Sequence, residues 1–131
     1  MSNVSLEKVT RQFGEFVAVD GIDLHVAEGE FVTLLGPSGC GKTTTLRMVA
    51  GLEQNTAGCI SIGDEPVSDP AHGIFTPPER RRLGMVFQSY AIWPHMTVFE
   101  NVAYPLRVRR RPAAEIRDLV TNALRLVEME G

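Results

Sequence analysis

Eight residues constrain the fold more than any other part of the chain: Gly36-Pro37-Ser38-Gly39-Cys40-Gly41-Lys42-Thr43. They fit the pattern G-x-x-x-x-G-K-[ST], a loop that cradles phosphate when a strand precedes it and a helix follows it. The largely apolar run Phe31–Leu35 predicts a strand in the middle of a sheet. Residues 42–50 lack proline and glycine and predict a helix, which Gly51 ends. The segment therefore favours an α/β fold.

The residue types in this phosphate loop, Gly36–Thr43, suit a nucleotide. Glycines let the backbone bend tightly and turn its N–H groups inward as an anion nest, and the following helix adds its positive N-terminal end. Lys42 brings a full charge to β- and γ-phosphate oxygens, the Thr43 hydroxyl is a hard ligand suited to Mg²⁺, and Thr44 can donate to the α-phosphate. The alternative is a glycine-rich turn that merely starts a helix. The flanking strand and helix favour phosphate binding.

Length and composition set the class of protein. With 131 residues, of which 44% are hydrophobic and 22% charged, the chain is expected to form one globular domain with a packed core. The net charge of −3 argues against nucleic acid as a partner. Two arginine clusters could suit phosphates or lipid head groups, but solvated faces are the simpler interpretation: residues 80–82, and Arg107 with residues 109–111.

Neither a membrane span nor a signal peptide is recognisable, so we expect a cytoplasmic protein.

Cys40 and Cys59 are expected to remain thiols. The three histidines, His25, His72 and His95, lack the spacing of metal ligands.

The remaining pattern predicts strands, loops and two helices. Alternation predicts half-exposed strands over residues 4–9, 22–26 and 58–62, a proline-rich irregular segment over 69–78, and a buried strand over Leu83–Phe87. Thr97 and Glu100 predict a capping box at the start of a helix that Pro105 should kink or end. A last helix from Pro112 carries an apolar stripe of six residues: Ile116, Leu119, Val120, Ala123, Leu124 and Val127.

Four segments together resemble the nucleotide-binding subunits of ATP-binding cassette (ABC) transporters: Val19–Leu24, Leu35–Thr44, Met85–Tyr90 and Thr97–Val102. The resemblance is to bacterial importers of the group serving sugars, polyamines, phosphonates and ferric iron. It implies a P-loop NTPase core with an antiparallel β subdomain, binding of ATP and Mg²⁺, and a place on the inner face of the cell membrane.

The resemblance also assigns residues outside the phosphate loop. It puts Phe13 on the adenine face and Ala18 near the base and ribose, although a core aromatic and a buried strand alanine are the alternatives. Gln88 takes the place of a glutamine whose amide oxygen completes the Mg²⁺ shell, whereas by itself it would pass as a polar surface residue. Lys42 and Gln88 are the expected catalytic residues, and Thr43 and Gln88 the expected metal ligands.

Two kinds of protein partner follow from the same resemblance. Residues 89–105 are expected to help form a groove for a coupling helix of the transmembrane permease subunit, with some of its apolar residues in the core instead: Tyr90, Ile92, Trp93, Met96 and Phe99. A second nucleotide-binding subunit is expected to complete the ATP site as a dimer.

The sequence departs from the family in what it lacks. It contains no Leu-Ser-Gly-Gly-Gln signature, no strand ending in an Asp-Glu pair and no following switch histidine, and it therefore resembles the N-terminal portion of a cassette. Asp64 and Glu65 belong to a predicted hairpin turn and are rejected as catalytic. The competing hypothesis is a truncated, non-hydrolytic nucleotide-binding or regulatory module. A P-loop kinase is the third and least favoured hypothesis, because it does not account for the Met85–Ser89 segment.

Overall fold

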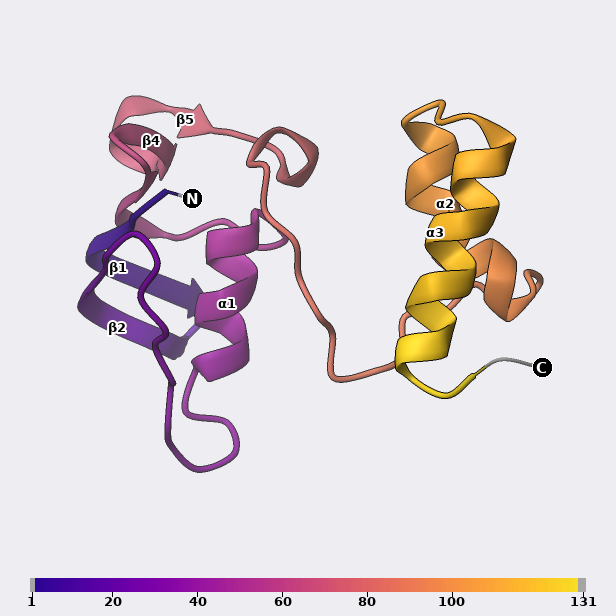
Figure 1. Ribbon diagram of the computed structural model, residues 1–131. Coiled ribbons are helices and arrows are strands. Elements are labelled where there is room, and N and C mark those ends of the chain that lie inside the picture. The colour runs from indigo at the N-terminus through magenta and orange to yellow at the C-terminus, as the bar shows by residue number, and fades with distance from the viewer. Residues whose placement is uncertain (1, 130–131) are drawn as a thin grey trace. The chain divides into compact units, whose positions relative to one another are not determined.

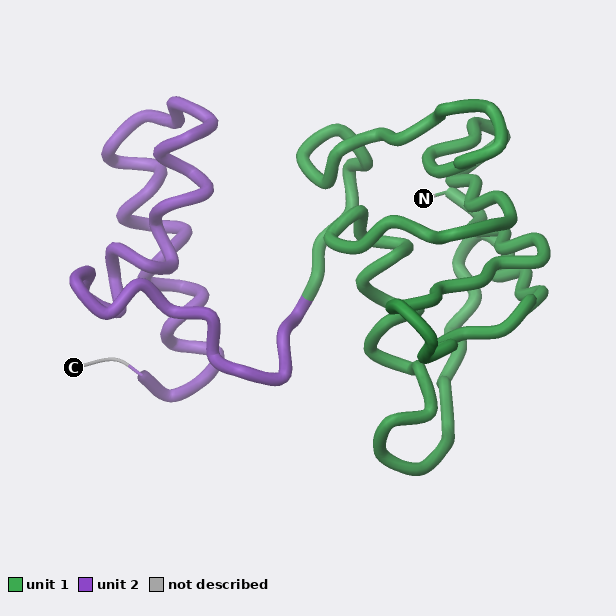
Figure 2. Tube along the Cα trace, turned by 180° about the vertical axis from the view of Figure 1, so that it is seen from behind, with its two compact units in different colours: residues 1–85 green, residues 86–131 purple. Residues whose placement is uncertain are grey.

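The computed structural model in Figure 1 describes residues 2–129 of the chain. The chain divides into two compact units, residues 1–85 and residues 86–131 (Figure 2). The expectation that the whole chain is the N-terminal part of one nucleotide-binding domain stays a prediction. The two units are described separately below.

The first unit contains a five-stranded antiparallel sheet with the order β2-β1-β3-β4-β5. Its strands are β1 (Val4–Phe13), β2 (Phe16–Val26), β3 (Ala57–Ile62), β4 (Glu65–Asp69) and β5 (Ile74–Phe75). The sequence correctly predicts the first part of β1, the second half of β2 and β3, while β1 continues beyond the predicted residues 4–9 to Phe13. Asp64 lies in the turn between β3 and β4, as expected, and the segment after β4 holds two short 3₁₀ helices, η1 (Pro70–His72) and η2 (Pro78–Arg80).

Helix α1 (Lys42–Ala50) has the predicted bounds and packs against the sheet through Met48, which is fully buried. One apolar cluster joins β1, β2, β3 and β4 to this helix: Leu6, Val9, Val19, Met48, Ile60 and Val67. The cluster holds α1, the helix that follows the phosphate loop, against the sheet.

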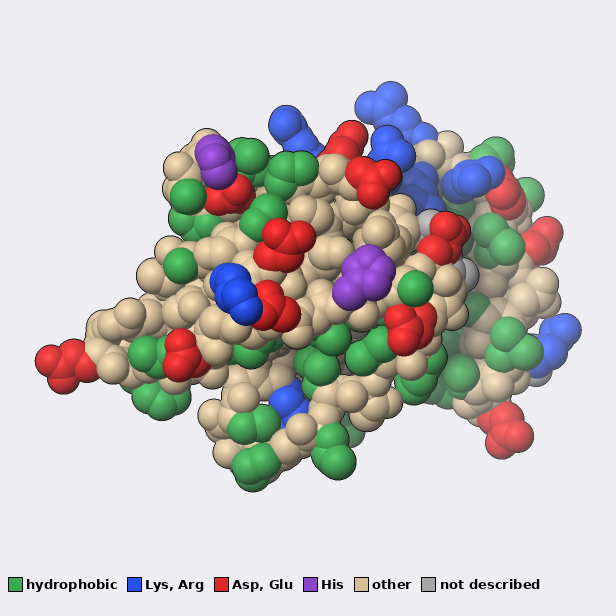
Figure 3. Space-filling model, turned by 90° about the vertical axis from the view of Figure 1, so that its left-hand side faces the viewer, with side chains coloured by type: hydrophobic (Ala, Val, Ile, Leu, Met, Phe, Trp, Pro, Cys, Tyr) green, Lys and Arg blue, Asp and Glu red, His purple; other side chains and the backbone are tan. Residues whose placement is uncertain are grey.

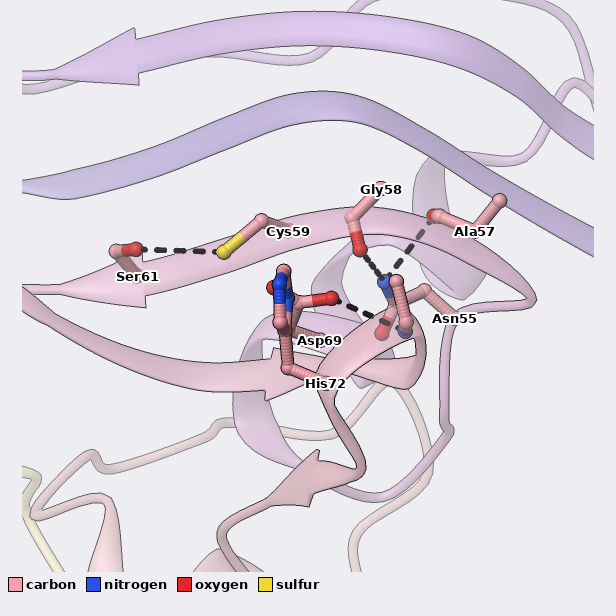
Figure 4. A network of polar contacts seen from close by, with 8 residues as sticks. Asn55, Ala57, Gly58, Cys59, Ser61, Asp69 and His72 are labelled. Carbon is pink, nitrogen blue, oxygen red and sulfur yellow. Dashed lines mark hydrogen bonds and ion pairs between the residues drawn. The ribbon is translucent and has the colours of Figure 1, made fainter.

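A buried asparagine ties the segment after α1 to the sheet. The side-chain amide of Asn55, which is only 2% exposed, donates to the carbonyls of Ala57 (3.1 Å) and Gly58 (2.6 Å), as Figure 4 shows. Its oxygen accepts from the hydroxyl of Ser68 on β4 at 2.5 Å. Because buried polar groups are costly when unpaired, this network fixes how β3 follows the helix.

Two predicted strands do not form, and both predictions are wrong. Phe31–Leu35 and Leu83–Phe87 have no regular structure, and Phe31, Leu35 and Val86 are more than nine-tenths exposed. A strand in the middle of a sheet needs hydrogen-bonded neighbours and cover on both faces. The five strands of the described residues pair only with one another, so these apolar runs have no sheet to join.

The second unit is built on a helical hairpin of α2 (Val98–Val108) and α3 (Ala113–Leu126). Thr97 and Glu100 form the predicted capping box, and Pro112 is the N-cap of α3. The hairpin buries a small core of Ala103, Ile116 and Val120, against which Phe99, Leu106 and Leu124 pack.

Pro105 lies inside α2 and does not end it, because the helix continues to Val108. Proline removes one backbone donor, but Leu106, the residue that follows it, packs into the hairpin core and favours continuation. The apolar stripe of α3 is only partly covered, since Leu119 and Val127 are 45% and 61% exposed.

Neither helix of the hairpin, nor α1, has the length and apolar character needed to cross a membrane.

The view in Figure 3 shows acidic, basic and hydrophobic side chains side by side, with several basic ones gathered at its upper right. Such a mixed face does not attract a polyanion over its whole extent.

Candidate nucleotide site

The phosphate loop joins the sheet at Gly41, the N-cap of α1. This glycine has a φ of 89°, in the left-handed region that favours glycine. A Cβ atom here would lie 2.4 Å from the carbonyl oxygen of Ala18 and 3.0 Å from Val19 on β2. The tight approach requires glycine and places Ala18 directly against the end of the loop. The assignment of Ala18 to the base and ribose stays a prediction.

Gly36, at the other end of the loop, lies close to two side chains of the loop itself. A Cβ atom at Gly36 would lie 2.5 Å from the sulfur of Cys40 and 3.8 Å from the ammonium of Lys42. The loop therefore folds back on itself, with its first residue beside its fifth and seventh. Gly39, at a φ of 80°, supplies a second left-handed residue. Gly39 and Gly41 thus adopt backbone conformations that favour glycine, and at Gly41 the close approach of the Ala18 carbonyl also excludes a side chain.

Lys42, the first residue of α1, turns its side chain back into the loop. Its ammonium donates to the carbonyls of Gly36 (2.5 Å) and Pro37 (2.6 Å) and contacts the Cys40 sulfur at 3.2 Å. The charge is thus held within the glycine loop at the positive end of a helix, where an anion is attracted. Phosphate oxygens are stronger acceptors for an ammonium than neutral carbonyls, so a bound phosphate can replace these partners.

The threonines after Lys42 have different environments. Thr45 is buried and bonds from both its backbone N–H (2.8 Å) and its hydroxyl (2.9 Å) to the carbonyl of Gly41, which stiffens the first helical turn. Thr43 is exposed and Thr44 half-buried. The Thr43 hydroxyl on the first turn is thus open to solvent and chemically suited to Mg²⁺.

Phe13 is the last residue of β1 and is 42% exposed, so the ring is not a plain core aromatic. This exposure leaves ring surface available for stacking, although the assignment to adenine stays a prediction.

Gln88 is exposed and belongs to the second unit. Its assignment to Mg²⁺ also stays a prediction.

The expected permease groove contains both exposed and half-buried residues. Tyr90 and Ile92 are 94% and 65% exposed, and Trp93 is 42% exposed with its ring 4.5 Å from that of Tyr104. Phe99 packs into the hairpin core instead. The exposed group is available to a partner, and Phe99 is structural.

Arg81 corrects the interpretation of the first arginine cluster as a solvated face. It is 3% exposed and donates to four carbonyls, those of Thr76 (2.7 Å), Met48 (2.8 Å), Val49 (3.0 Å) and Val67 (3.2 Å). Burial lowers the pKa of its guanidinium. Two of these carbonyls belong to the last turn of α1, the negative end of the helix, so Arg81 anchors the end opposite the phosphate loop.

Among residues 2–129 no three histidine, cysteine, aspartate or glutamate side chains cluster as a metal site. His25 bonds to Ser5 at 2.8 Å, and His72 pairs with Asp69 at 2.6 Å beside the asparagine network (Figure 4). The hydrogen bond from His72 lowers the pKa of the Asp69 carboxyl.

Comparison with known proteins identifies the family. The family model described as ABC transporter matches residues 19–131, which is most of the chain. The chain belongs to the ABC transporter family. The ABC match includes the whole phosphate loop, α1 and Gln88.

Curated relatives of this ABC chain are import proteins. It is 54% identical to the trehalose/maltose import ATP-binding protein MalK of Thermococcus litoralis, over 97% of the chain and 34% of that protein. It is 52% identical to the spermidine/putrescine import ATP-binding protein PotA of Marinobacter nauticus, over 97% of the chain and 32% of that protein. The chain thus spans about a third of the length of the curated relatives it matches.

Among solved structures, the dimeric ATP-binding cassette MJ0796 in a post-hydrolysis state, bound to ADP and Pi, is similar. Its TM-score is 0.80 at 31% identity, covering 97% of this chain and 58% of that one. The expected fold class, an α/β portion of an ABC ATPase, is therefore confirmed.

The position of Cys40 in the loop leads to a prediction. Its thiol is exposed beside Lys42, so Mg-ATP bound in the loop should shield it, and maleimide labelling should slow severalfold when the site is mostly occupied. Mass spectrometry measures the labelling rate, with the half-buried Cys59 as an internal control. Equal slowing at both cysteines, or at neither, would contradict the placement of Cys40 at the phosphates.

Proposed function

We propose that this chain is the nucleotide-binding portion of the ATPase subunit of an ABC importer, and that Mg-ATP bound at Gly36–Thr43 energises solute transport across a membrane. The observation that carries the proposal is the Lys42 ammonium held inside the glycine loop at the N-terminus of α1. Membership of the ABC transporter family and the import functions in the names of the relatives support it.

Each residue then has a defined task. Lys42 exchanges its carbonyl partners for β- and γ-phosphate oxygens, and the backbone N–H groups of residues 36–44 surround the phosphates. Thr43 and Gln88 would hold Mg²⁺, which neutralises phosphate charge when bound. Phe13 stacks on adenine, and Ala18 lies near the base and ribose.

The partners belong to the proposal as well. The exposed Tyr90, Ile92 and Trp93 support a contact between residues 89–105 and a transmembrane permease subunit, since exposed aromatic side chains favour protein interfaces. The dimeric state of the MJ0796 cassette supports pairing with a second nucleotide-binding subunit. Such a protein works in the cytoplasm, on the inner face of the cell membrane.

Calorimetric titration of the chain with Mg-ATP tests the proposed function. We expect saturable binding of one nucleotide per chain, with ADP as a competitor, because both nucleotides present a β-phosphate to Lys42. Absence of saturable binding would contradict the proposal. The alternative of a non-hydrolytic regulatory module is tested by the coding sequence after the Gly131 codon, where a Leu-Ser-Gly-Gly-Gln-type signature would favour the transporter.

A further inference from the structure

The end of β1 presents a pair of side chains, Arg11 and Phe13, near the last part of the phosphate loop. Arg11 pairs with Val19 of β2, the residue against which Gly41 of the loop packs. The pairing of β1 with β2 is irregular on both sides of Arg11, but the contact of its guanidinium with the Phe13 ring puts these two side chains on one face. The ion pair of Arg11 with Glu53, which follows α1, puts Arg11 on the side of the sheet that this helix covers through Met48.

Arg11 lies over the ring of Phe13, with its guanidinium carbon 4.2 Å from the ring centroid. It also forms an ion pair with Glu53 at 2.6 Å, and both side chains are only 23% exposed. Glu53 follows the end of α1, and its N–H donates to the carbonyl of Arg47 in that helix. The guanidinium therefore links the aromatic ring to the phosphate-loop helix.

The Arg11 guanidinium covers one face of the Phe13 ring. A guanidinium stacked on an aromatic face is attracted by the ring quadrupole, and the ion pair with Glu53 restricts its position. Phe13 nevertheless remains 42% exposed, so part of the ring is open to a ligand. The Nε atom of Arg11 is buried without a hydrogen-bond partner within residues 2–129, a cost that the stacking and the ion pair must offset.

We infer that Arg11 is a positioning residue for the base of the nucleotide, an inference that rests on the proposed function. Its guanidinium backs one face of Phe13 and holds the ring in place, so that adenine stacks on the exposed ring surface. A ring that is already fixed loses less conformational freedom when the base binds. Arg11 thereby favours a ligand with an aromatic base over one that offers phosphates alone.

Binding of two ligands, ATP and inorganic triphosphate, separates this role from a general structural one. Both use the phosphate loop, but only ATP has a base. Arg11→Met keeps the length of the side chain and removes its charge, and we expect it to weaken ATP binding about three- to tenfold while triphosphate binding changes less than about twofold. Arg11→Lys keeps the cation without the planar stack and is expected to give an intermediate ATP affinity.

Arg117→Met removes the same charge from the exposed face of α3 and serves as the matched control. The inference is overturned if Arg11→Met leaves the ratio of ATP to triphosphate affinity unchanged, including the case in which both affinities fall together. Triphosphate binding by each variant also reports that the loop is folded. Failure of the unmodified chain to bind either ligand would instead contradict the proposed function.

Discussion

Replacing Lys42 with alanine is expected to weaken Mg-ATP binding by at least about tenfold, roughly 1.4 kcal/mol. The ammonium carries a full charge inside the phosphate loop, within 2.6 Å of two loop carbonyls. A charge-assisted contact to the β- and γ-phosphates is stronger than a neutral hydrogen bond, so its loss removes the largest side-chain contribution. Titration with a fluorescent ATP analogue measures the change.

Arg47→Ala is the matched control for this substitution, because Arg47 is a basic, exposed residue in the last turn of the same helix. It should leave the affinity within about twofold of that of the unmodified chain, since the attraction between exposed charges is weak and screened by salt. Unchanged affinity in Lys42→Ala would show that Gly36–Thr43 is only a glycine-rich turn. Equal loss in both variants would indicate a nonspecific charge effect.

The sequence predicts the features that depend on near neighbours along the chain. The bounds of α1 follow from Gly41 and Gly51, which both adopt left-handed backbone conformations at its ends. The capping box of Thr97 and Glu100 is likewise a local exchange of hydrogen bonds over three residues. Such signals need no knowledge of the tertiary fold.

The errors concern long-range contacts. Phe31–Leu35 has the composition of a central strand, but strand formation depends on neighbours that the described residues do not provide. Arg81 looks like one member of a solvated run, and only the fold brings the carbonyls of Met48 and Val67 to its guanidinium. Pro105 would break an isolated helix, whereas the packing of Leu106 favours its continuation.

The candidate site shows the same division. The glycine pattern identifies the phosphate loop, including the positive φ of Gly39 and Gly41. Arg11 gives no such signal, because a basic residue near the end of an alternating strand is normally solvated. A spacing of two from Phe13 puts both on one strand face, but the ion pair with Glu53, 42 residues later in the sequence, is visible only in the fold.

The second large effect concerns chemistry: the 131-residue chain is expected to bind ATP without measurable turnover. Lys42, Thr43 and Gln88 can position phosphates and neutralise their charge, but none can accept a proton from the attacking water as a carboxylate does. The sequence has no second acidic strand end and no signature loop to complete the site from a partner subunit. Phosphate release by the purified chain is the measurement, with Lys42→Ala as the background.

Release well above that background would contradict the prediction, and its concentration dependence would show where the missing group lies. A rate that rises with the square of protein concentration requires two chains to form one site. The first residues to replace would then be Asp64, in the turn after β3, and Glu65, which begins β4. Loss of phosphate release in Asp64→Asn or Glu65→Gln would show that a carboxylate of this turn region acts on the water. The prediction that neither residue is catalytic would then be wrong.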